Sequence, residues 1–225
     1  MSKRIVDLSV TIGEETLSPP SVDKRLRLTT HTMEGESHWQ GSEVDMLLHT
    51  GSHVDFERHT VAGGETAEDV SLDRVIGDAF VVDLSDGGAN YEITLEDVKR
   101  EAADVRDGDI VLIRTDWTDR EWGNYPTYYE DSPYCAPEAA EWLVENGAKA
   151  IGFDCFSEYS ARLPDFEPED FVIHKVILEN DAILMQHLIN LGELPQEGRV
   201  PFFGPFLKIA GGEGAPARFF AVLDE

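Results

Sequence analysis

The stretch His49-Thr50-Gly51-Ser52-His53-Val54-Asp55-Phe56-Glu57-Arg58-His59 holds three of the seven histidines of this 225-residue chain. Neutral imidazole and carboxylate bind Zn²⁺, Mn²⁺ or Fe²⁺ at neutral pH. Gly51 and Ser52 break a helical pattern, so we expect a strand end, a tight turn at Gly51 and then an extended segment. In an extended segment His53 and Asp55 point to the same face, and the turn brings His49 back toward them. The pattern therefore predicts three ligands, His49, His53 and Asp55, with coordination positions left open for catalysis.

The sequence around this stretch is rich in short apolar segments, which are typical of buried strands. We expect strands at Lys3–Leu8, Leu26–Thr30, Val44–Leu48, Ala79–Leu84, Ile110–Arg114, Ala150–Phe153, Ile183–Met185, Phe206–Ile209 and Phe219–Leu223. Helices are fewer: one begins at Thr94 with a capping box, one begins at Pro137 and ends before Gly147, and one begins at Pro168. The mixture predicts the α/β class, with a mixed sheet, a barrel-like core and one domain over residues 1–225.

The composition of the chain limits the partners that it can bind and indicates the salt concentration to which it is adapted. The chain has 18 basic and 45 acidic residues, a formal net charge of −27, which repels nucleic acid and anionic membranes. Acidity spread along the chain favours a protein adapted to high salt, where self-repulsion is screened. No apolar run has the roughly 20 residues of a membrane span, and no signal-peptide pattern opens the chain, so we expect a cytoplasmic location. The two cysteines, Cys135 and Cys155, form no metal-binding or redox motif and are expected to be buried thiols.

Several motifs together resemble those of the metal-dependent cyclase-type hydrolases, a family that includes bacterial kynurenine formamidase and isatin hydrolase. The hallmark H-x-G-T-H-x-D-x-P-x-H is matched from His49 to His59, with Ser52 in place of Thr and Glu57 in place of Pro. Further matches occur in the same order at 7–9 (DLS), 112–117 (LIRTDW), 152–157 (GFDCFS) and 183–191 (ILMQHLINL). The resemblance implies a barrel-like core of the swivelling β/β/α type and a homodimer or homotetramer.

The resemblance also implies roles for individual residues. His49, His53 and Asp55 would bind the metal, and His59 would act as general acid/base. In the formamidases a His and a Glu twelve positions later complete a two-zinc site; here the pair is His174 and Gln186. Neutral glutamine is a weaker ligand than carboxylate, so we expect one divalent ion, Mn²⁺ or Zn²⁺, bound also by the side-chain oxygen of Gln186. His174 would then orient the substrate.

Each of these residues also has a simpler, structural interpretation. His59 and His174 would be structural histidines, and Gln186 would be a buried amide bonded to backbone. His187 is expected on the opposite face of its strand, away from the site, and His31 and His38 at the surface. The aromatic stretch Trp117–Tyr129 would cover a pocket, form a subunit contact or fill the core.

The function predicted from these residues is hydrolysis of an amide, lactam or formamide bond in a small molecule, with aromatic molecules among the candidates. A metal-activated water would attack the carbonyl carbon, and His59 would carry the proton. Two alternatives remain open at this point: a non-catalytic protein that binds a metal or metabolite, and a metal-dependent lyase or dehydratase on the same scaffold.

Overall fold

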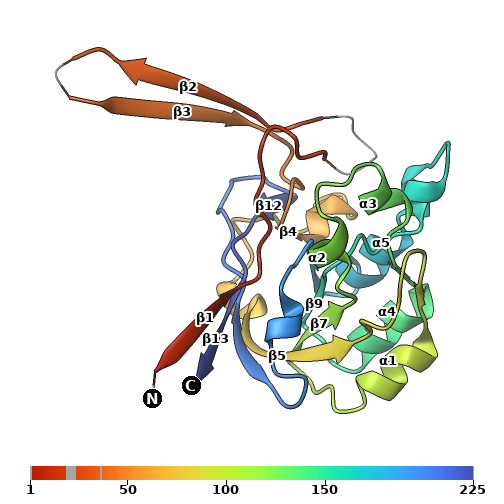
Figure 1. Ribbon diagram of the computed structural model, residues 1–225. Helices are drawn as coiled ribbons and strands as arrows, with labels where there is room; N and C mark the ends of the chain where they lie inside the picture. The colour runs from red at the N-terminus through yellow and green to blue at the C-terminus, as the bar shows by residue number, and fades with distance from the viewer. Residues whose placement is uncertain (1, 19–23, 36, 225) are drawn as a thin grey trace.

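A curled sheet of nine strands forms the body of the protein in the computed structural model, which describes residues 2–18, 24–35 and 37–224 (Figure 1). The strand order is β1-β13-β11-β5-β7-β9-β10-β4-β12, with parallel pairing among the four central strands and antiparallel pairing toward both edges. Its strands are β1 (Lys3–Asp7), β4 (His53–Asp55), β5 (Ile76–Asp83), β7 (Ile110–Arg114), β9 (Ala150–Phe153), β10 (Ile183–Gln186), β11 (Val200–Phe203), β12 (Gly214–Pro216) and β13 (Phe220–Asp224). The predicted α/β class with a mixed, curled sheet is confirmed.

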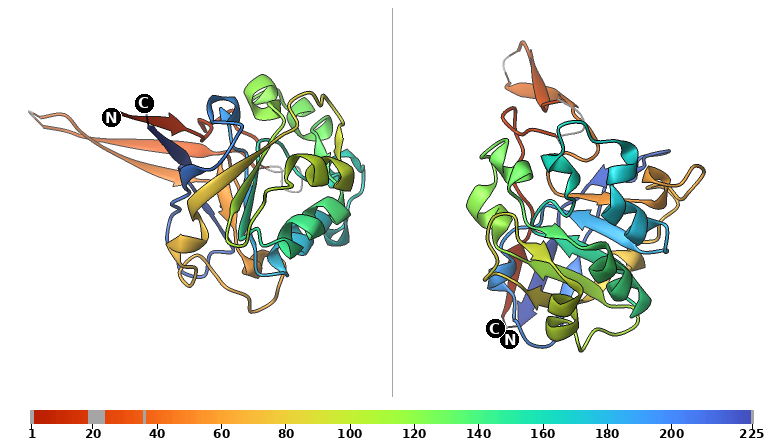
Figure 2. Two further views of the ribbon diagram at one scale, coloured as in Figure 1. Left: turned by 90° about the horizontal axis from the view of Figure 1, so that it is seen from below. Right: turned by 90° about the vertical axis from the view of Figure 1, so that its right-hand side faces the viewer.

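The centre of the sheet follows directly from the sequence. Strands β7 and β9 are buried along almost their whole length, which is why they consist of continuous apolar runs. Helices cover one face of these strands, and the curl of the sheet encloses a second apolar core on the other face (Figure 2). Phe153 faces the helices, whereas Val54 of β4 lies in the second core. Strand β4, which carries His53 and Asp55, is therefore anchored to the second core through Val54.

Two of the three predicted helix starts agree with the structure. Helix α1 has the expected capping box, in which Thr94 and Asp97 bond each other's backbone N–H groups. Pro137 opens α4 at a position where its missing N–H costs no hydrogen bond. The third helix begins at Val172 and not at Pro168, because Pro168–Asp170 forms a separate 3₁₀ turn. The α-helices are α1 (Leu95–Glu101), α2 (Trp117–Glu121), α3 (Thr127–Glu130), α4 (Pro137–Glu145) and α5 (Val172–Leu178), and the other 3₁₀ turns are η1 (Glu57–His59), η2 (Leu72–Arg74), η3 (Ser160–Arg162) and η5 (Leu191–Glu193).

Three predicted strands, Leu26–Thr30, Val44–Leu48 and Phe206–Ile209, differ from the structure in position or burial. Strand β3 spans Trp39–Asp45 and, within the part of the chain that the structure describes, pairs only with β2 (Arg27–Met33); the two extend away from the body as a hairpin arm (Figures 1 and 2). Every residue of β2 and β3 is exposed, including Val44, which was expected to lie in the core. Residues 206–209 contain an isolated bridge at Phe206 and no strand. The short pair β6 (Glu92–Ile93) and β8 (Tyr134–Cys135) was not predicted.

Other expectations about single residues are confirmed. Cys135 and Cys155 are buried free thiols, and His31 and His38 are exposed. Within the aromatic stretch 117–129, Trp117, Tyr128 and Tyr129 fill the core, whereas Trp122 and Tyr125 are only partly buried. Among the described residues, no helix has the length and apolar character needed to cross a bilayer.

Candidate metal centre

The turn at 47–52 directs the histidines of the 49–59 stretch toward one another. Gly51 has φ +69°, and a side chain there would collide with Ile12, so glycine is required for the predicted tight turn. Strand β4 follows at once and is paired on both sides, with His53 opposite Gln186 of β10 and opposite Pro216 of β12. The local pattern predicted from the sequence, a turn and then an extended segment, is therefore present.

Asp55 lies at the centre of the cluster with no exposed surface. Its Oδ1 is 2.7 Å from Nδ1 of His49 and 3.2 Å from Nε2 of His53. His53 donates its Nδ1–H to the carbonyl oxygen of Gly51 at 2.7 Å, so its Nε2 carries a lone pair in the neutral ring. That lone pair and the carboxylate oxygen repel each other unless a proton or a metal cation lies between them.

His174 approaches the same carboxylate from α5. Its Nε2 is 3.6 Å from Oδ2 of Asp55, while its Nδ1 is 2.7 Å from Oε1 of the buried Glu158. Glu158 also accepts the backbone N–H of His174 at 2.9 Å. The Nδ1 proton is therefore held by Glu158, and Nε2 faces Asp55. Burial acts against a charged ring, but the carboxylates of Glu158 and Asp55 outweigh it and raise the pKa of His174.

His59, at the end of η1, completes the ring of imidazoles. Its ring centroid is 4.3 Å from that of His49 and 5.5 Å from that of His174. Ligand atoms of His49, Asp55 and His59 lie within 4.8 Å of one another, close enough to share one ion. His59 is the exposed member of this group, and it borders the pocket. Five of the six site residues predicted from the sequence, His49, His53, Asp55, His59 and His174, are thus brought together.

Gln186 also reaches the cluster, from the end of β10. Its side chain is 1% exposed and donates Nε2–H to Oγ of Ser157 at 2.9 Å. Its Oε1 has no hydrogen-bond partner within the described ranges and lines the same pocket as His53. The competing interpretation, a buried amide whose oxygen is bonded to backbone, does not describe this geometry.

His187 was expected to point away from the site, and that expectation is wrong. Its backbone has φ +58°, in the left-handed region, so the alternation of side chains along β10 ends there. His187 and Gln186 both line the pocket. The ring of His187 lies 5.5 Å from that of His53 and accepts or donates a 2.7 Å hydrogen bond between Nδ1 and the hydroxyl of Tyr128.

Two carboxylates of the site were not predicted from the sequence, because each lies far along the chain from the histidine that it contacts. Glu213, just before β12, places Oε1 3.1 Å from Nε2 of His49. Glu158 follows β9 and holds His174. Neither forms a spacing motif with the histidines. The only signal is that Glu158 comes directly after the GFDCFS segment.

Asp154 and Ser157, from the same GFDCFS segment, support the site and do not face the reacting space. Asp154 accepts the backbone N–H groups of Thr115 and Asp116, and burial nevertheless raises its pKa to about 7. Ser157 accepts from Gln186, as described above. These contacts fix the ends of β7 and β9 next to the pocket.

The charges of the cluster shift its pKa values in opposite directions. Burial acts against a charged His49, but Asp55 and Glu213 outweigh it and raise the pKa of His49 to about 9. Burial would raise the pKa of Asp55, yet the surrounding His53 and His49 hold it well below its usual value. For His59, desolvation by neighbouring atoms and the nearby imidazoles lower the pKa to about 4, so this ring is neutral at pH 7.

These residues fit a divalent cation. Three buried polar atoms, Oδ2 of Asp55, Oε1 of Gln186 and Nε2 of His187, lack hydrogen-bond partners among the described residues. Buried polar atoms normally have hydrogen-bond partners, so three such atoms without partners around one space indicate a binding site for a positively charged group. Imidazole, carboxylate and amide oxygen are the donor types that Mn²⁺ and Zn²⁺ accept.

A cavity of about 230 Å³ opens over the cluster. Its apolar wall is formed by Leu47, Phe156 and Phe171. A second cavity of about 410 Å³ shares His59, Phe171 and His174 with the first, and adds Phe166 and Lys175. The polar cluster thus forms the floor of a pocket with aromatic walls, the usual form of a small-molecule site.

Comparison with known proteins places this arrangement in a family. The family model "Putative cyclase" matches residues 6–158, which include the whole 49–59 stretch. The chain belongs to this cyclase family.

Two relatives and one solved structure match most or all of this cyclase-family chain. It is 25% identical to the kynurenine formamidase of Salinibacter ruber over 221 residues, 95% of each protein. It is 26% identical to the isatin hydrolase of Roseibium aggregatum over 191 residues, 78% of this chain and 72% of that protein. A solved structure titled as a potential metal-dependent hydrolase with cyclase activity covers all of both chains, with 26% identity and a TM-score of 0.78.

Proposed function

We propose that this chain is a metal-dependent hydrolase that cleaves an amide, lactam or formamide bond of a small aromatic molecule. The observation that carries the proposal is the fully buried Asp55 carboxylate, which ring nitrogens of His49, His53 and His174 approach to 2.7, 3.2 and 3.6 Å, while its Oδ2 has no hydrogen-bond partner among the described residues. The names of the relatives, kynurenine formamidase and isatin hydrolase, support hydrolysis of a carbon–nitrogen bond.

One divalent cation would be held by His49, His53, Asp55 and the side-chain oxygen of Gln186. When bound, such a cation polarises a substrate carbonyl and lowers the pKa of a water molecule toward neutrality. Because position 186 is an amide, the donor set favours one ion over two.

His59 would carry the proton. Its lowered pKa keeps it neutral at pH 7, the form that takes a proton from the attacking water. It would then return that proton to the leaving nitrogen as the carbon–nitrogen bond breaks. The products are a carboxylate and an amine.

The remaining pocket residues would position the substrate. Glu158 fixes the ring of His174, which borders both cavities and can orient the substrate carbonyl. Phe156 and Phe171 offer aromatic surfaces above the reacting groups, which favours an aromatic ring over an aliphatic chain.

The test is a preparation stripped of metal with a chelator and assayed at 1 M NaCl on isatin, N-formylkynurenine and a panel of aryl and alkyl formamides. We expect activity to return with Mn²⁺ or Zn²⁺ and to favour aryl substrates. Equal activity without metal would falsify the proposal.

Reaction in ¹⁸O-labelled water separates the alternatives. A hydrolase transfers the label to the product carboxylate, whereas a lyase or dehydratase does not. A protein that binds metal but turns over none of the panel would support a non-catalytic role.

A further inference from the structure

The second cavity, of about 410 Å³, adjoins the cavity of about 230 Å³ that opens over the cluster. His59, Phe171 and His174 line both cavities, whereas Thr60 and Lys175 line only the second. A molecule whose reacting bond lies at His59 and His174 can therefore extend with its remaining part into the second cavity. The side chains found only there decide which molecules fit.

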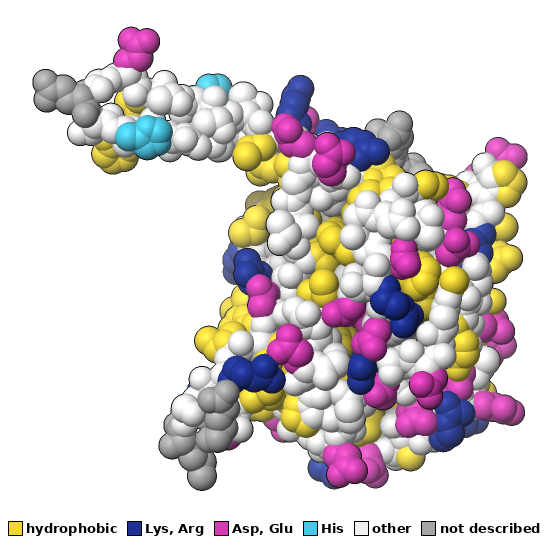
Figure 3. All heavy atoms as spheres, in the orientation of Figure 1, with side chains coloured by type: hydrophobic (Ala, Val, Ile, Leu, Met, Phe, Trp, Pro, Cys, Tyr) yellow, Lys and Arg dark blue, Asp and Glu magenta, His cyan; other side chains and the backbone are white. Residues whose placement is uncertain are grey.

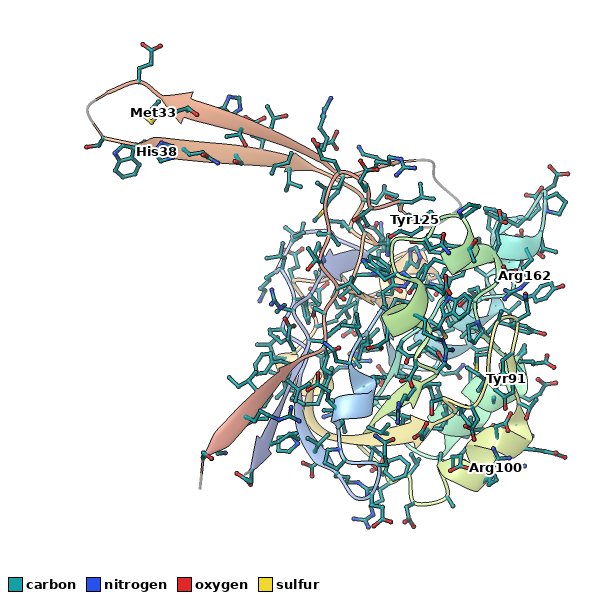
Figure 4. The ribbon with its side chains drawn as sticks, in the orientation of Figure 1. Met33, His38, Tyr91, Arg100, Tyr125 and Arg162 are labelled. Atoms are coloured by element: carbon teal, nitrogen blue, oxygen red, sulfur yellow. The ribbon has the colours of Figure 1, made fainter. Side chains whose placement is uncertain are left out.

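Lys175 is a partly buried cation that pairs with no described carboxylate, although the chain has 45 acidic residues against 18 basic ones. Acidic side chains are scattered over the face of the body that Figure 3 shows. Two arginines labelled in Figure 4 show how basic groups are usually engaged in this protein. Arg100 pairs with Asp97 and Glu101, and Arg162 lies over two tyrosine rings.

The helix that carries Lys175 offers it one carboxylate, that of Glu179 four residues later. Helix α5 ends at Leu178, so Glu179 is its C-cap residue. A lysine followed by a glutamate four positions later is the weaker orientation of a helical ion pair, and these two side chains form none. The ammonium group of Lys175 is therefore available to a ligand in the cavity that it lines.

The other walls of the second cavity suit a flat ring that carries an anion. The rings of Phe166 and Phe171 pack edge to face, with centroids 5.5 Å apart, and Pro168 lies beside them in the wall. Thr60 adds a buried hydroxyl group that has no hydrogen-bond partner among the residues described. A hydroxyl group donates readily to a carboxylate, so Thr60 and Lys175 supply one neutral and one cationic donor to the same cavity.

We propose that the second cavity is a carboxylate-binding subsite, in which Lys175 pairs with a carboxylate of the substrate and selects anionic aryl amides over neutral ones. This inference rests on the proposed hydrolase function, and it narrows the substrate to aromatic amides or formamides with a carboxylate away from the bond that is cleaved. Two donors match the single charge and two oxygens of a carboxylate. A phosphate monoester carries nearly two charges, and one cation would leave it poorly neutralised in so acidic a chain.

High salt favours this form of recognition. The formal net charge of −27 repels any anionic substrate at long range. At 1 M salt charges are screened beyond about 3 Å, so the repulsion from distant carboxylates is lost while a direct ion pair inside a cavity is screened much less. Lys175 can therefore bind an anion although the protein as a whole is strongly negative.

The experiment compares matched substrates by steady-state kinetics, using the full chain loaded with Mn²⁺ at 1 M NaCl. Each formanilide of the series carries a carboxylate, on the ring or at the end of a short alkyl chain, and is paired with the carboxamide of the same shape. We expect the wild type to hydrolyse at least one carboxylate with a kcat/KM about tenfold or more above that of its carboxamide, the effect of about one charge-assisted hydrogen bond.

Three variants assign that preference to one side chain. Lys175→Met should reduce the ratio of the two kcat/KM values to about one, mainly through a higher KM for the carboxylate, and Lys175→Arg should restore most of it. Lys99→Met is the matched control, because Lys99 is exposed on α1, lines neither cavity, and carries the same charge. It should keep the wild-type ratio. Each ratio is measured on one preparation, so a partly unfolded variant still reports it correctly.

A wild-type ratio near one for every pair would overturn the proposal. So would a Lys175→Met variant that keeps the wild-type ratio, which is the result expected if the carboxylate coordinates the metal instead. A Lys99→Met variant that loses the preference as fully as Lys175→Met would show a general effect of charge and overturn it too.

Isothermal titration calorimetry of the same compounds separates the subsite from the hydrolase function. If none of the compounds is hydrolysed, the hydrolase function fails for this series, and binding still decides the subsite. A carboxylate that binds the wild type about tenfold more tightly than its carboxamide, and binds Lys175→Met no more tightly, supports the subsite. Equal binding of the two compounds to the wild type overturns it.

Discussion

The affinity of the site for metal should depend steeply on pH because of His49. Its Nδ1 is 2.7 Å from Asp55 and its Nε2 is 3.1 Å from Glu213, so both ring nitrogens face carboxylates. This arrangement raises the pKa of His49 to about 9 in the metal-free protein. A protonated imidazole has no lone pair to offer, so a proton and a metal ion compete for this ring.

The size of the effect follows from the two-unit gap between pH 7 and that pKa. At pH 7 about one molecule in a hundred has a neutral His49, so metal affinity is about 100-fold below its alkaline limit, or about 2.7 kcal/mol. Protonation of His49 has the opposite effect on the stability of the metal-free protein, which it increases. Because the folded pKa lies above the unfolded value of 6.5, its stabilisation is complete below about pH 6.5 and is lost as pH rises toward 9.

The assay is a competition titration of Mn²⁺ against a chelator at fixed ionic strength between pH 7 and 9.5. We expect the apparent dissociation constant to fall about tenfold per pH unit and to level near pH 9. Glu213→Gln removes one of the two carboxylates and should move the break to lower pH. An affinity that changes less than about threefold across this range would refute the assignment of His49 as a ligand that must first lose a proton.

Four further results are expected. His59→Ala should lower kcat about 100-fold or more while metal content stays unchanged; loss of metal would make His59 a ligand and not a proton carrier. Gln186→Glu should raise the metal content, measured by elemental analysis, from one ion per chain toward two, and unchanged content would contradict the role of position 186. Gly51→Ala should lower the free energy of unfolding by about 2 kcal/mol or more in denaturant titrations and weaken metal binding, since the left-handed turn has no room for a side chain. The melting temperature should rise between 0.1 and 2 M NaCl as the charge of −27 is screened; a fall would contradict adaptation to high salt.

The parts of the fold that the sequence predicted are those in which local pattern and tertiary environment agree. Strands β7 and β9 are uniformly apolar because both of their faces are covered. Helix α1 begins at a capping box, which is a contact between residues three apart. The arm was missed because the apolar segment Val44–Leu48 has the composition of a buried strand, although Val44 is exposed on the arm.

The residues of the site also fall into those that local sequence predicted and those that it did not. His49, His53 and Asp55 lie within seven consecutive residues, so a turn and a short strand suffice to bring them together, and the sequence alone predicts this. His187 was misplaced because a single left-handed residue ended the alternation of the strand. Glu158 and Glu213 reach the histidines only through the pairing and curl of the sheet, which no spacing encodes.

The sequence by itself determined the chemistry available to this protein: imidazoles and a carboxylate on one turn and strand, an amide at position 186, and a strongly acidic surface. Only the tertiary structure decided which proton each histidine holds, because that depends on Glu158, Glu213 and the carbonyl of Gly51 acting through space. It also decided that the arm lies outside the core, since burial is a property of the packed sheet and not of the apolar residues themselves.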